Sequence, residues 1–404
     1  MGTDADKGEF YNQVNTIVKK GEGFLSLLAS MGFSPNQNKV LDRLFTGKEA
    51  EKMVGKTIKT IAKLYADDAE NKDFFMPAKS PSTGRSTGFS LKQINAMRDQ
   101  FGTRPSRRQG EKPFVLAVQS FKGGVAKSVT TVHLAQYLAL AGYRTLIMDC
   151  DPQASATSSF GYIPDLTFGQ EHTILPYLNR DNEDQTLDYA IMKTYFDGID
   201  LIPGCLPLYE AEFGLYYDQF SETNANIAQS YREEFANGIA TVSDKYDIII
   251  LDSPPALGMI SINIMVAADG IIVPTPPSLY DFASTTQYFK MAQKISEALP
   301  DKHFSFMKIL ATRFDAARPT AREFVEIMRE EFGQYMYKNE FRATGAIPTA
   351  AMYFKTLYDI SHKDRAEHGL RVDKKNMGML DNIFAEILED IHQSWGRTDR
   401  KSKK

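Results

Sequence analysis

The stretch that decides the fold is Phe121-Lys122-Gly123-Gly124-Val125-Ala126-Lys127-Ser128. It follows an apolar run at 114–118 and precedes an apolar-periodic segment, 129–140, that ends at Gly142. This order indicates a strand, a tight glycine-containing loop and a helix. The free backbone N–H groups of such a loop and the dipole of the following helix both attract an anion. The sequence therefore predicts a phosphate cradle.

Two side chains of this stretch suit a nucleotide. Lys127 can reach the β- and γ-phosphates, and the hydroxyl of Ser128 can ligate Mg²⁺. The spacing matches the pattern G-x-x-x-x-G-K-[ST] only in part, because Phe121 and Ala126 stand where the pattern has glycine. A Gly-Gly turn before an ordinary helix is the alternative, and the other motifs decide between the two.

Two further apolar runs end in carboxylates. Residues 145–148 lead into Asp149 and Asp151, and residues 248–251 lead into Asp252, which Ser-Pro-Pro follows. Ligands of open α/β sheets bind beyond the carboxyl ends of the strands. We predict that Asp151 orients a water for attack on a γ-phosphate and that Asp252 holds Mg²⁺. For Asp149, a role in the site and a role in capping the next helix both remain open.

The rest of the chain favours an α/β fold. Apolar runs at 199–202, 270–275 and 306–312 alternate with helical patterns, which predicts a mostly parallel, twisted sheet covered by helices. The last helix, expected at 379–395, has one apolar and one acidic face. A membrane-surface helix would carry Lys and Arg on its polar face, so we expect this helix to pack on the core.

Composition narrows the class of protein. A chain of 404 residues is too long for one ordinary domain, and 43% hydrophobic with 24% charged residues is typical of soluble globular proteins. The net charge of −4 excludes a chain that is basic overall but permits local basic surfaces. Its 2 cysteines predict neither a disulfide framework nor a cluster site, and we expect a cytoplasmic protein without signal peptide or membrane span.

The N-terminal segment, residues 1–44, is expected to be helical. Residues 10–31 have helical apolar spacing that Gly21 and Gly23 interrupt, and a second helix is expected around residues 39–45. These helices could pack on the main body or pair with a second copy of the chain. The pattern does not decide between packing and dimerisation.

Residues 45–109 have the outline of a winged helix-turn-helix domain. Thr46 with Glu49 forms a capping box, Gly55 makes a turn, and a basic helix is expected at 56–65. A loop rich in Pro, Ser, Gly and basic residues follows, and a second capping box opens at Ser90. A small helical docking domain with a solvated charged face is the alternative. If the segment binds DNA, the candidate contacts are Lys56, Thr57, Lys59, Thr60, Lys63, Lys79 and Arg85.

Three motifs together resemble those of the ParA/MinD ATPases. The stretch from Lys122 to Ser128 resembles their deviant Walker A motif, 149–153 resembles their D-x-D-P-Q motif, and 252–258 resembles D-x-P-P-x-L-G. The N-terminal extension narrows the resemblance to large plasmid-partition ParA proteins with a winged helix-turn-helix. Short sequence segments at 132–140, 193–196, 356–358 and 394–397 resemble those of RepA proteins of repABC plasmids.

This resemblance implies a function. Residues 110–397 would form a weak Mg²⁺-dependent ATPase domain, followed by a basic tail at 398–404. Two subunits would enclose ATP, with Lys122 acting in the partner's site. ATP-bound dimers would coat nucleoid DNA non-specifically, a ParB-like centromere-binding protein would stimulate hydrolysis, and the ADP or apo form would repress its own operon. The implied ATP- and ADP-binding residues are Lys122, Gly123, Gly124, Val125, Ala126, Lys127, Ser128 and Val129.

Three functions compete at this point. The first is a partition ATPase, the second a nucleotide-sensing repressor without a transport role, and the third a MinD-like membrane-associated ATPase. The acidic face of the last helix and the outline of a DNA-binding domain count against the third. We interpret the first two as two nucleotide states of one protein.

Overall fold

The computed structural model describes residues 4–28, 40–67, 72–79, 84, 86–164, 167–179, 185–212, 215, 232–299, 302–370 and 374–397. The expected basic tail and Arg85, one of the candidate DNA contacts, lie outside these residues. Among the described residues, none of the helices combines the length and the apolar character that a membrane crossing requires.

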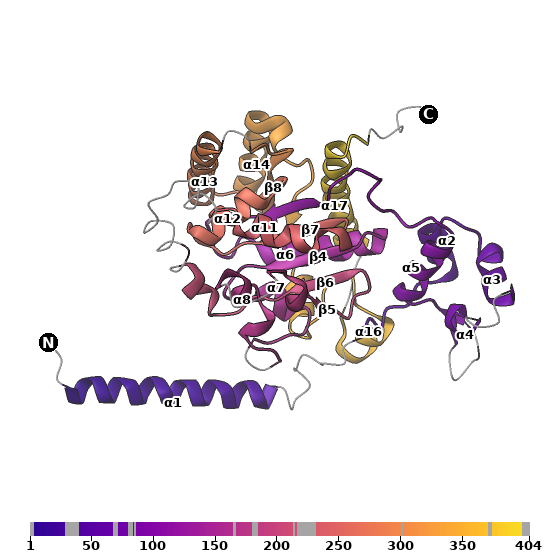
Figure 1. Ribbon diagram of the computed structural model, residues 1–404, viewed down its shortest axis with the longest axis horizontal. Coiled ribbons are helices and arrows are strands. Elements are labelled where there is room, and N and C mark those ends of the chain that lie inside the picture. The colour runs from indigo at the N-terminus through magenta and orange to yellow at the C-terminus, as the bar shows by residue number, and fades with distance from the viewer. Residues whose placement is uncertain are drawn as a thin grey trace.

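An eight-stranded sheet forms the centre of the chain, in the order β10-β9-β8-β3-β7-β4-β6-β5 (Figure 1). Every neighbouring pair is parallel except β5 with β6. This arrangement confirms the predicted mostly parallel α/β fold. The strands are β3 (Phe114–Val118), β4 (Thr145–Asp149), β5 (Met192–Lys193), β6 (Ile199–Ile202), β7 (Ile248–Asp252), β8 (Gly270–Thr275), β9 (Phe306–Phe314) and β10 (Phe341–Arg342).

Helices cover both faces of the sheet because the central strands are apolar on both sides. Every residue of β3, β4, β7 and β8 is buried. One face packs against α6 and α17, and the other against α11, α12 and α13. The helices of this body are α6 (Lys127–Ala141), α7 (Ser155–Ser159), α8 (Leu175–Leu178), α11 (Glu234–Val242), α12 (Met259–Ala267), α13 (Leu279–Ala298), α14 (Pro319–Phe332), α15 (Ala346–Ala351), α16 (His362–His368) and α17 (Lys374–Ser394).

The last helix, α17, packs on the core as its apolar pattern predicts. Leu380, Ile383, Ile387 and Ile391 are all fully buried. They belong to the same apolar cluster as α6.

Residues 45–101 form a separate group of elements on one side of the body (Figure 1), which we call the helix–hairpin module. Gly55, at φ 71°, separates its first two helices, and its two short strands pair antiparallel. Both expected capping boxes are confirmed, at Thr46 and at Ser90. The elements are α2 (Gly47–Val54), α3 (Ile58–Asp67), α4 (Lys72–Phe75), β1 (Ala78–Lys79), β2 (Ser86–Gly88) and α5 (Leu91–Gln100).

Two expectations for the N-terminal segment are wrong. Helix α1 (Asp4–Leu28) continues through Gly21 and Gly23, because a glycine costs a helix only about 1 kcal/mol. Residues 40–44 are not helical, since the N–H and C=O groups of Phe45 pair with Phe89 as a β-bridge and keep the chain extended. Residues 29–39 lie outside the described part, and the question of packing or dimerisation stays open.

Candidate nucleotide-binding site

The predicted motifs meet at one edge of the sheet. Val118, the last residue of β3, lies opposite Asp252 of β7, and Asp149 of β4 lies opposite Asp252 on its other side. The Gly-Gly loop (residues 119–126) follows β3 directly and leads into α6. The sheet register therefore brings the loop and the carboxylates to the same carboxyl edge.

The end of β9 holds the Gly-Gly loop from outside. Thr312 donates its Oγ1–H to the carbonyl of Val125 at 2.9 Å, and Nη1 of Arg313 donates to the carbonyl of Gly124 at 2.9 Å. In a trans peptide the C=O and the following N–H point in opposite directions. The N–H groups of Val125 and Ala126 therefore point away from β9.

Two residues of α6 bind two further loop carbonyls in a similar way. Nζ of Lys127 donates to the carbonyl of Lys122 at 3.0 Å, and Oγ1 of Thr130 donates to that of Ala126 at 2.7 Å. With these carbonyls engaged, the loop amides are available to an anion.

Ala126 is the point at which the loop turns into α6. Its φ of 72° is left-handed, a conformation that costs a residue with a Cβ about 1–2 kcal/mol relative to glycine. No side chain caps the start of α6, so the N–H groups of its first turn have no internal acceptor. A phosphate oxygen would supply that acceptor.

Lys127 is buried with carboxylates around it. Its residue exposure is 6%. Burial lowers the pKa of the ammonium, while the charges of Asp252 and Asp151 act in the opposite direction. The arrangement places a cation at the helix start, where a phosphate would arrive.

Asp252 has an unused oxygen inside the site. Thr131 donates its hydroxyl to Oδ1 at 2.9 Å, and Oδ2, although buried, has no hydrogen-bond partner within the part of the chain that the structure describes. Burial, followed by the charge of Asp149, raises the pKa of Asp252 to about 8, while a hydrogen bond from Ser128 lowers it. A buried carboxylate oxygen beside a serine hydroxyl is a donor set that a hard cation accepts, so these residues fit Mg²⁺.

The two carboxylates after β4 differ in what they contact. Asp149 Oδ2 accepts from the N–H and the hydroxyl of Thr157, at 2.8 and 2.7 Å, and burial raises the pKa of Asp149 to about 6. These bonds favour the capping interpretation for Asp149. Asp151 Oδ1 accepts from the N–H of Gln153 at 2.9 Å, and burial raises the pKa of Asp151 while this hydrogen bond and the charge of Lys127 oppose the shift.

The side chain of Lys122 does not contribute its charge to the buried group of Lys127, Asp151 and Asp252. Its ammonium pairs instead with Asp281 on the first turn of α13, and its side chain is 40% exposed. Its expected action in a partner's site stays a prediction.

The candidate DNA contacts of the helix–hairpin module are only partly in the expected places. The helix begins at Ile58 and not at Lys56, because the Oγ1 of Thr57 accepts the N–H of Thr60 and thereby precedes the first turn. Lys56 lies over the ring of Phe101, with Nζ 5.7 Å from the centroid. Exposed basic side chains remain on α3 and β1, namely Lys59, Lys63 and Lys79.

Sequence reasoning missed the contacts that Thr131, Thr312 and Arg313 make in this site. Thr312 and Arg313 lie near the carboxyl end of the apolar strand β9, so this position at a strand end was the available signal. Arg313 has a φ of 52°, which is unusual for a residue with a side chain.

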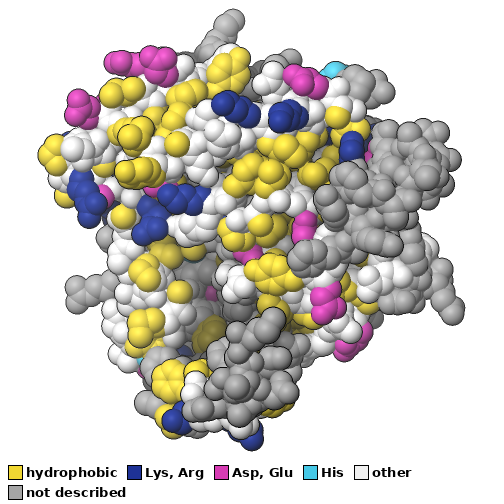
Figure 2. Space-filling model, turned by 90° about the vertical axis from the view of Figure 1, so that its left-hand side faces the viewer, with side chains coloured by type: hydrophobic (Ala, Val, Ile, Leu, Met, Phe, Trp, Pro, Cys, Tyr) yellow, Lys and Arg dark blue, Asp and Glu magenta, His cyan; other side chains and the backbone are white. Residues whose placement is uncertain are grey.

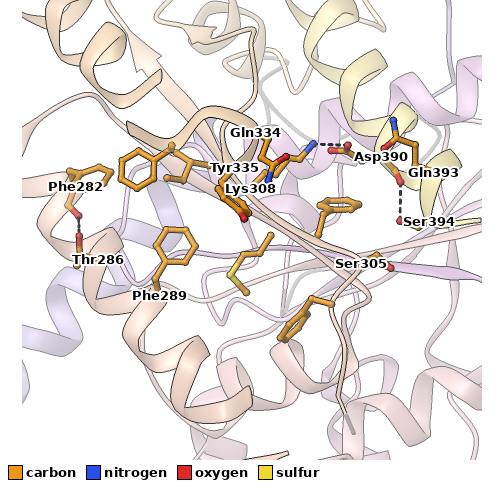
Figure 3. Close-up of a pocket in the computed structure, with 15 residues that line it drawn as sticks. Phe282, Thr286, Phe289, Ser305, Lys308, Gln334, Tyr335, Asp390, Gln393 and Ser394 are labelled. Atoms are coloured by element: carbon orange, nitrogen blue, oxygen red, sulfur yellow. Dashed lines mark hydrogen bonds and ion pairs between the residues drawn. The ribbon is translucent and has the colours of Figure 1, made fainter. Parts of the chain in front are cut away.

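A second hollow, of about 1080 Å³, lies between α13, β9 and α17 (Figure 3). Its walls are mainly apolar, and Phe282, Phe289 and Tyr335 are among the lining residues. Lys308, the basic side chain among its described lining residues, is paired with Asp390 at 2.6 Å. This hollow therefore offers little to a phosphate, and the Gly-Gly loop remains the candidate nucleotide site.

Comparison with known proteins supports this assignment. A family model described as an AAA domain matches residues 114–305. Replication protein A of Sinorhizobium fredii is 31% identical over 398 residues, which cover 95% of this chain and 94% of the relative. Protein SopA of Escherichia coli is 33% identical over 365 residues, 88% of this chain and 91% of the relative.

The fold is also similar to that of a solved structure along almost its whole length. A structure described as a partition protein superposes with a TM-score of 0.64 at 18% identity, covering 96% of this chain and 99% of the other.

Proposed function

Because the chain belongs to the ParA family of P-loop partition ATPases, we propose that it hydrolyses ATP to ADP and phosphate and uses this cycle to partition DNA. The observation that carries the proposal is the buried group of Lys127, Asp252 and Asp151 beside a loop whose amides are turned inward. Such a group suits a triphosphate and its cation better than an uncharged ligand.

Each residue has a role in this reaction. The loop amides and Lys127 bind the phosphates. Asp151 orients the attacking water and takes its proton as the water oxygen bonds to the γ-phosphorus, and the bond from the β,γ-bridging oxygen to that phosphorus breaks to release ADP. Ser128 and Asp252 would hold Mg²⁺, which neutralises phosphate charge when it is bound. Hydrolysis is expected to be slow without a partner protein.

A second copy of the chain is the expected neighbour at this edge. Leu257, Leu279 and Tyr280 follow the carboxyl ends of β7 and β8, and their exposures are 53%, 71% and 83%. Figure 2 faces the side of the molecule opposite the module and shows apolar side chains spread among basic and acidic ones there. Exposed apolar residues around a charged site support an ATP-dependent homodimer in which Lys122 leaves Asp281 for the partner's phosphates.

The helix–hairpin module is the expected operator-binding part. Its exposed Lys59, Lys63 and Lys79 would hold DNA phosphates in the ADP or apo form. The ATP-bound dimer would bind DNA without sequence preference, in association with the nucleoid. A centromere-bound ParB-like protein would stimulate hydrolysis and release it.

The test is duplex binding and hydrolysis by the full chain. We expect Mg²⁺-dependent release of phosphate from ATP, and binding to a random duplex that requires ATP and weakens steeply with salt. Absence of hydrolysis with Mg²⁺ and DNA present would contradict the proposal. Random-duplex binding that ignores ATP, with hydrolysis intact, would favour a nucleotide-sensing repressor.

A further inference from the structure

The C-terminal end of α6 is held by arginines that come from the N-terminal side of the chain. Nη2 of Arg98, on α5, donates to the carbonyl of Leu140 at 2.8 Å, and Nε of Arg104 donates to that of Gly142 at 2.9 Å. The last carbonyls of a helix have no partner within it and carry partial negative charge. Two cations at this end therefore cap α6. Arg98 attaches it to the helix–hairpin module directly, and Arg104, in the segment that follows the module, also pairs with Asp99 of α5 at 2.9 Å.

Arg98 joins three elements at once. Besides Leu140 it donates from Nε to the carbonyl of Met53 at the end of α2, and from Nη1 to Oδ1 of Asn95, at 2.9 and 2.8 Å. Its residue exposure is 2%, and burial, followed by the charge of Arg104, lowers its pKa to about 10. Asn95 in turn donates to Asp197, which precedes β6, at 2.7 Å.

Gly142 makes this contact tight. Its φ is 114°, and a Cβ there would lie 2.7 Å from Cδ of Pro105 and 3.1 Å from Nη1 of Arg98. The connecting chain thus passes directly over the end of α6.

The module also shares its apolar core with the body. Phe89, Ile94 and Met97 of the module belong to the same buried cluster as Leu138 and Tyr143. A module attached in this way moves with α6, whereas one on a loose linker would move independently.

We propose that α6 couples the nucleotide site to the helix–hairpin module, with Arg98 and Arg104 as the positioning residues that pass its movement on. The helix has 15 residues and spans about 22 Å, from the Gly-Gly loop at one end to the capping arginines at the other. This coupling rests on the proposed function in one respect, namely that the module binds operator DNA. It adds the route by which the nucleotide alters that binding.

The physical basis of this coupling is that N–H groups at the start of α6 lack hydrogen-bond acceptors. Without an anion, α6 begins at a strained Ala126 with uncapped N–H groups. A nucleotide supplies acceptors there and favours one position of the loop and helix. Because the far end of α6 is bonded to α5, that position biases the module, and the effect must be reciprocal.

The experiment measures this coupling as a ratio. The affinity of the full chain for the duplex that precedes its own coding sequence is measured without nucleotide and with saturating Mg-ADP. In the wild type we expect the duplex affinities with and without Mg-ADP to differ by a ratio of about 5- to 150-fold. Arg104→Ala and Arg98→Lys should bring the ratio close to one while ADP still binds. Arg108→Ala is the matched control, since this arginine of the same segment is exposed and bonds through its backbone N–H to Glu111, and it should keep the wild-type ratio.

A second readout needs no DNA. Hydrogen exchange of the α5 amides should change on adding Mg-ADP in the wild type and in Arg108→Ala, but not in Arg104→Ala. Unchanged α5 exchange in the wild type, or a wild-type ratio in both Arg104→Ala and Arg98→Lys, would overturn the coupling. Duplex binding that ignores ADP, combined with ADP-dependent α5 exchange, would instead refute the operator role and support the coupling.

Discussion

The two ends of α6 are built in opposite ways. At its N-terminus no side chain caps the helix, and the preceding residue, Ala126, is in a left-handed conformation. At its C-terminus Arg98 and Arg104 take up backbone carbonyls, and Gly142 ends the helix in a tight contact. The N-terminal end of α6 can therefore bind and release a ligand, whereas the C-terminal end is hydrogen-bonded to other parts of the fold.

This difference teaches how a single helix can serve two purposes. The unpaired N–H groups at the N-terminal end can donate hydrogen bonds to a bound phosphate. The carbonyls at the other end already accept hydrogen bonds, and this makes the helix part of a rigid unit. Variants at the N-terminal end should therefore change nucleotide affinity or turnover, and variants at the C-terminal end should change stability or coupling.

The largest expected effect is that of Lys127→Ala. It removes the buried cation between Asp151 and Asp252, and leaving those carboxylates uncompensated costs about 3–5 kcal/mol. We expect ATP affinity, measured by titration calorimetry, to fall more than about 100-fold. Lys122→Ala should keep monomer affinity, since Lys122 pairs with Asp281 outside the site. Unchanged affinity in Lys127→Ala would mean that the Gly-Gly loop is not the cradle.

Asp151→Ala should separate chemistry from binding. Loss of the group that orients water should lower phosphate release by about 100-fold or more, while ATP-dependent dimers persist in sedimentation experiments. Continued hydrolysis at the wild-type rate would assign the water-positioning role to another residue.

Gly142→Ala tests the C-terminal end. The new Cβ meets Pro105 and Arg98 at a positive φ, so we expect the free energy of unfolding to fall by about 1–3 kcal/mol. Mg-ATP affinity should change less than about 3-fold, because this end does not contact the nucleotide. Denaturant unfolding and calorimetry measure the two effects, and a loss of affinity with full stability would contradict the contrast.

Thr312→Val should have a smaller effect at the N-terminal end. It removes the hydrogen bond to the carbonyl of Val125, worth about 1 kcal/mol, and leaves that buried carbonyl unpaired. Nucleotide affinity should fall about 5-fold, and Thr312→Ser, which keeps the hydroxyl, should restore most of it. Equal nucleotide affinity in Thr312→Val and Thr312→Ser would show that the hydrogen bond from β9 does not position the loop.

The last prediction concerns the pH dependence of stability that a residue in the middle of α6 contributes. Nδ1–H of His133 donates to the carbonyl of Val129, and Nε2 accepts the N–H of Leu357, so the buried ring is neutral. Burial lowers the pKa of His133, whereas an unfolded histidine titrates near 6.5. Its contribution is therefore present above about pH 6.5 and is lost as pH falls below it, by up to about 1 kcal/mol per pH unit.

Urea unfolding measured from about pH 7.5 to about pH 5 follows this loss, because the two pH values lie on either side of the pKa of an unfolded histidine. His133→Gln should show a shallower pH dependence than the wild type. Identical slopes would show that other groups set the acid sensitivity.

The parts of the site that follow directly from local sequence could be predicted. An apolar run ending in Asp252, and a Gly-Gly loop before Lys127, each carry their own structural signal. Thr312 and Arg313 could not be linked to the loop, because sequence does not say that β9 lies two strands from β3. Nothing in the sequence around Arg104 indicates a distant partner, and only the fold reveals that it caps a helix 38 residues further along.

Helix ends at the N-terminus were predicted least well. The helix α1 passes through two glycines, and the stretch before Thr46 is extended by its bridge to Phe89, a contact between distant residues. Local propensity contains no information about such a partner.

The most direct test of the central claim is reciprocity between the two ends of α6. The affinity of the full-length wild type for Mg-ADP is measured by calorimetry, with and without a saturating amount of the duplex that precedes its coding sequence. The account predicts that the duplex changes ADP affinity by the same factor by which ADP changes duplex affinity. ADP affinity that is identical with and without the duplex would contradict it.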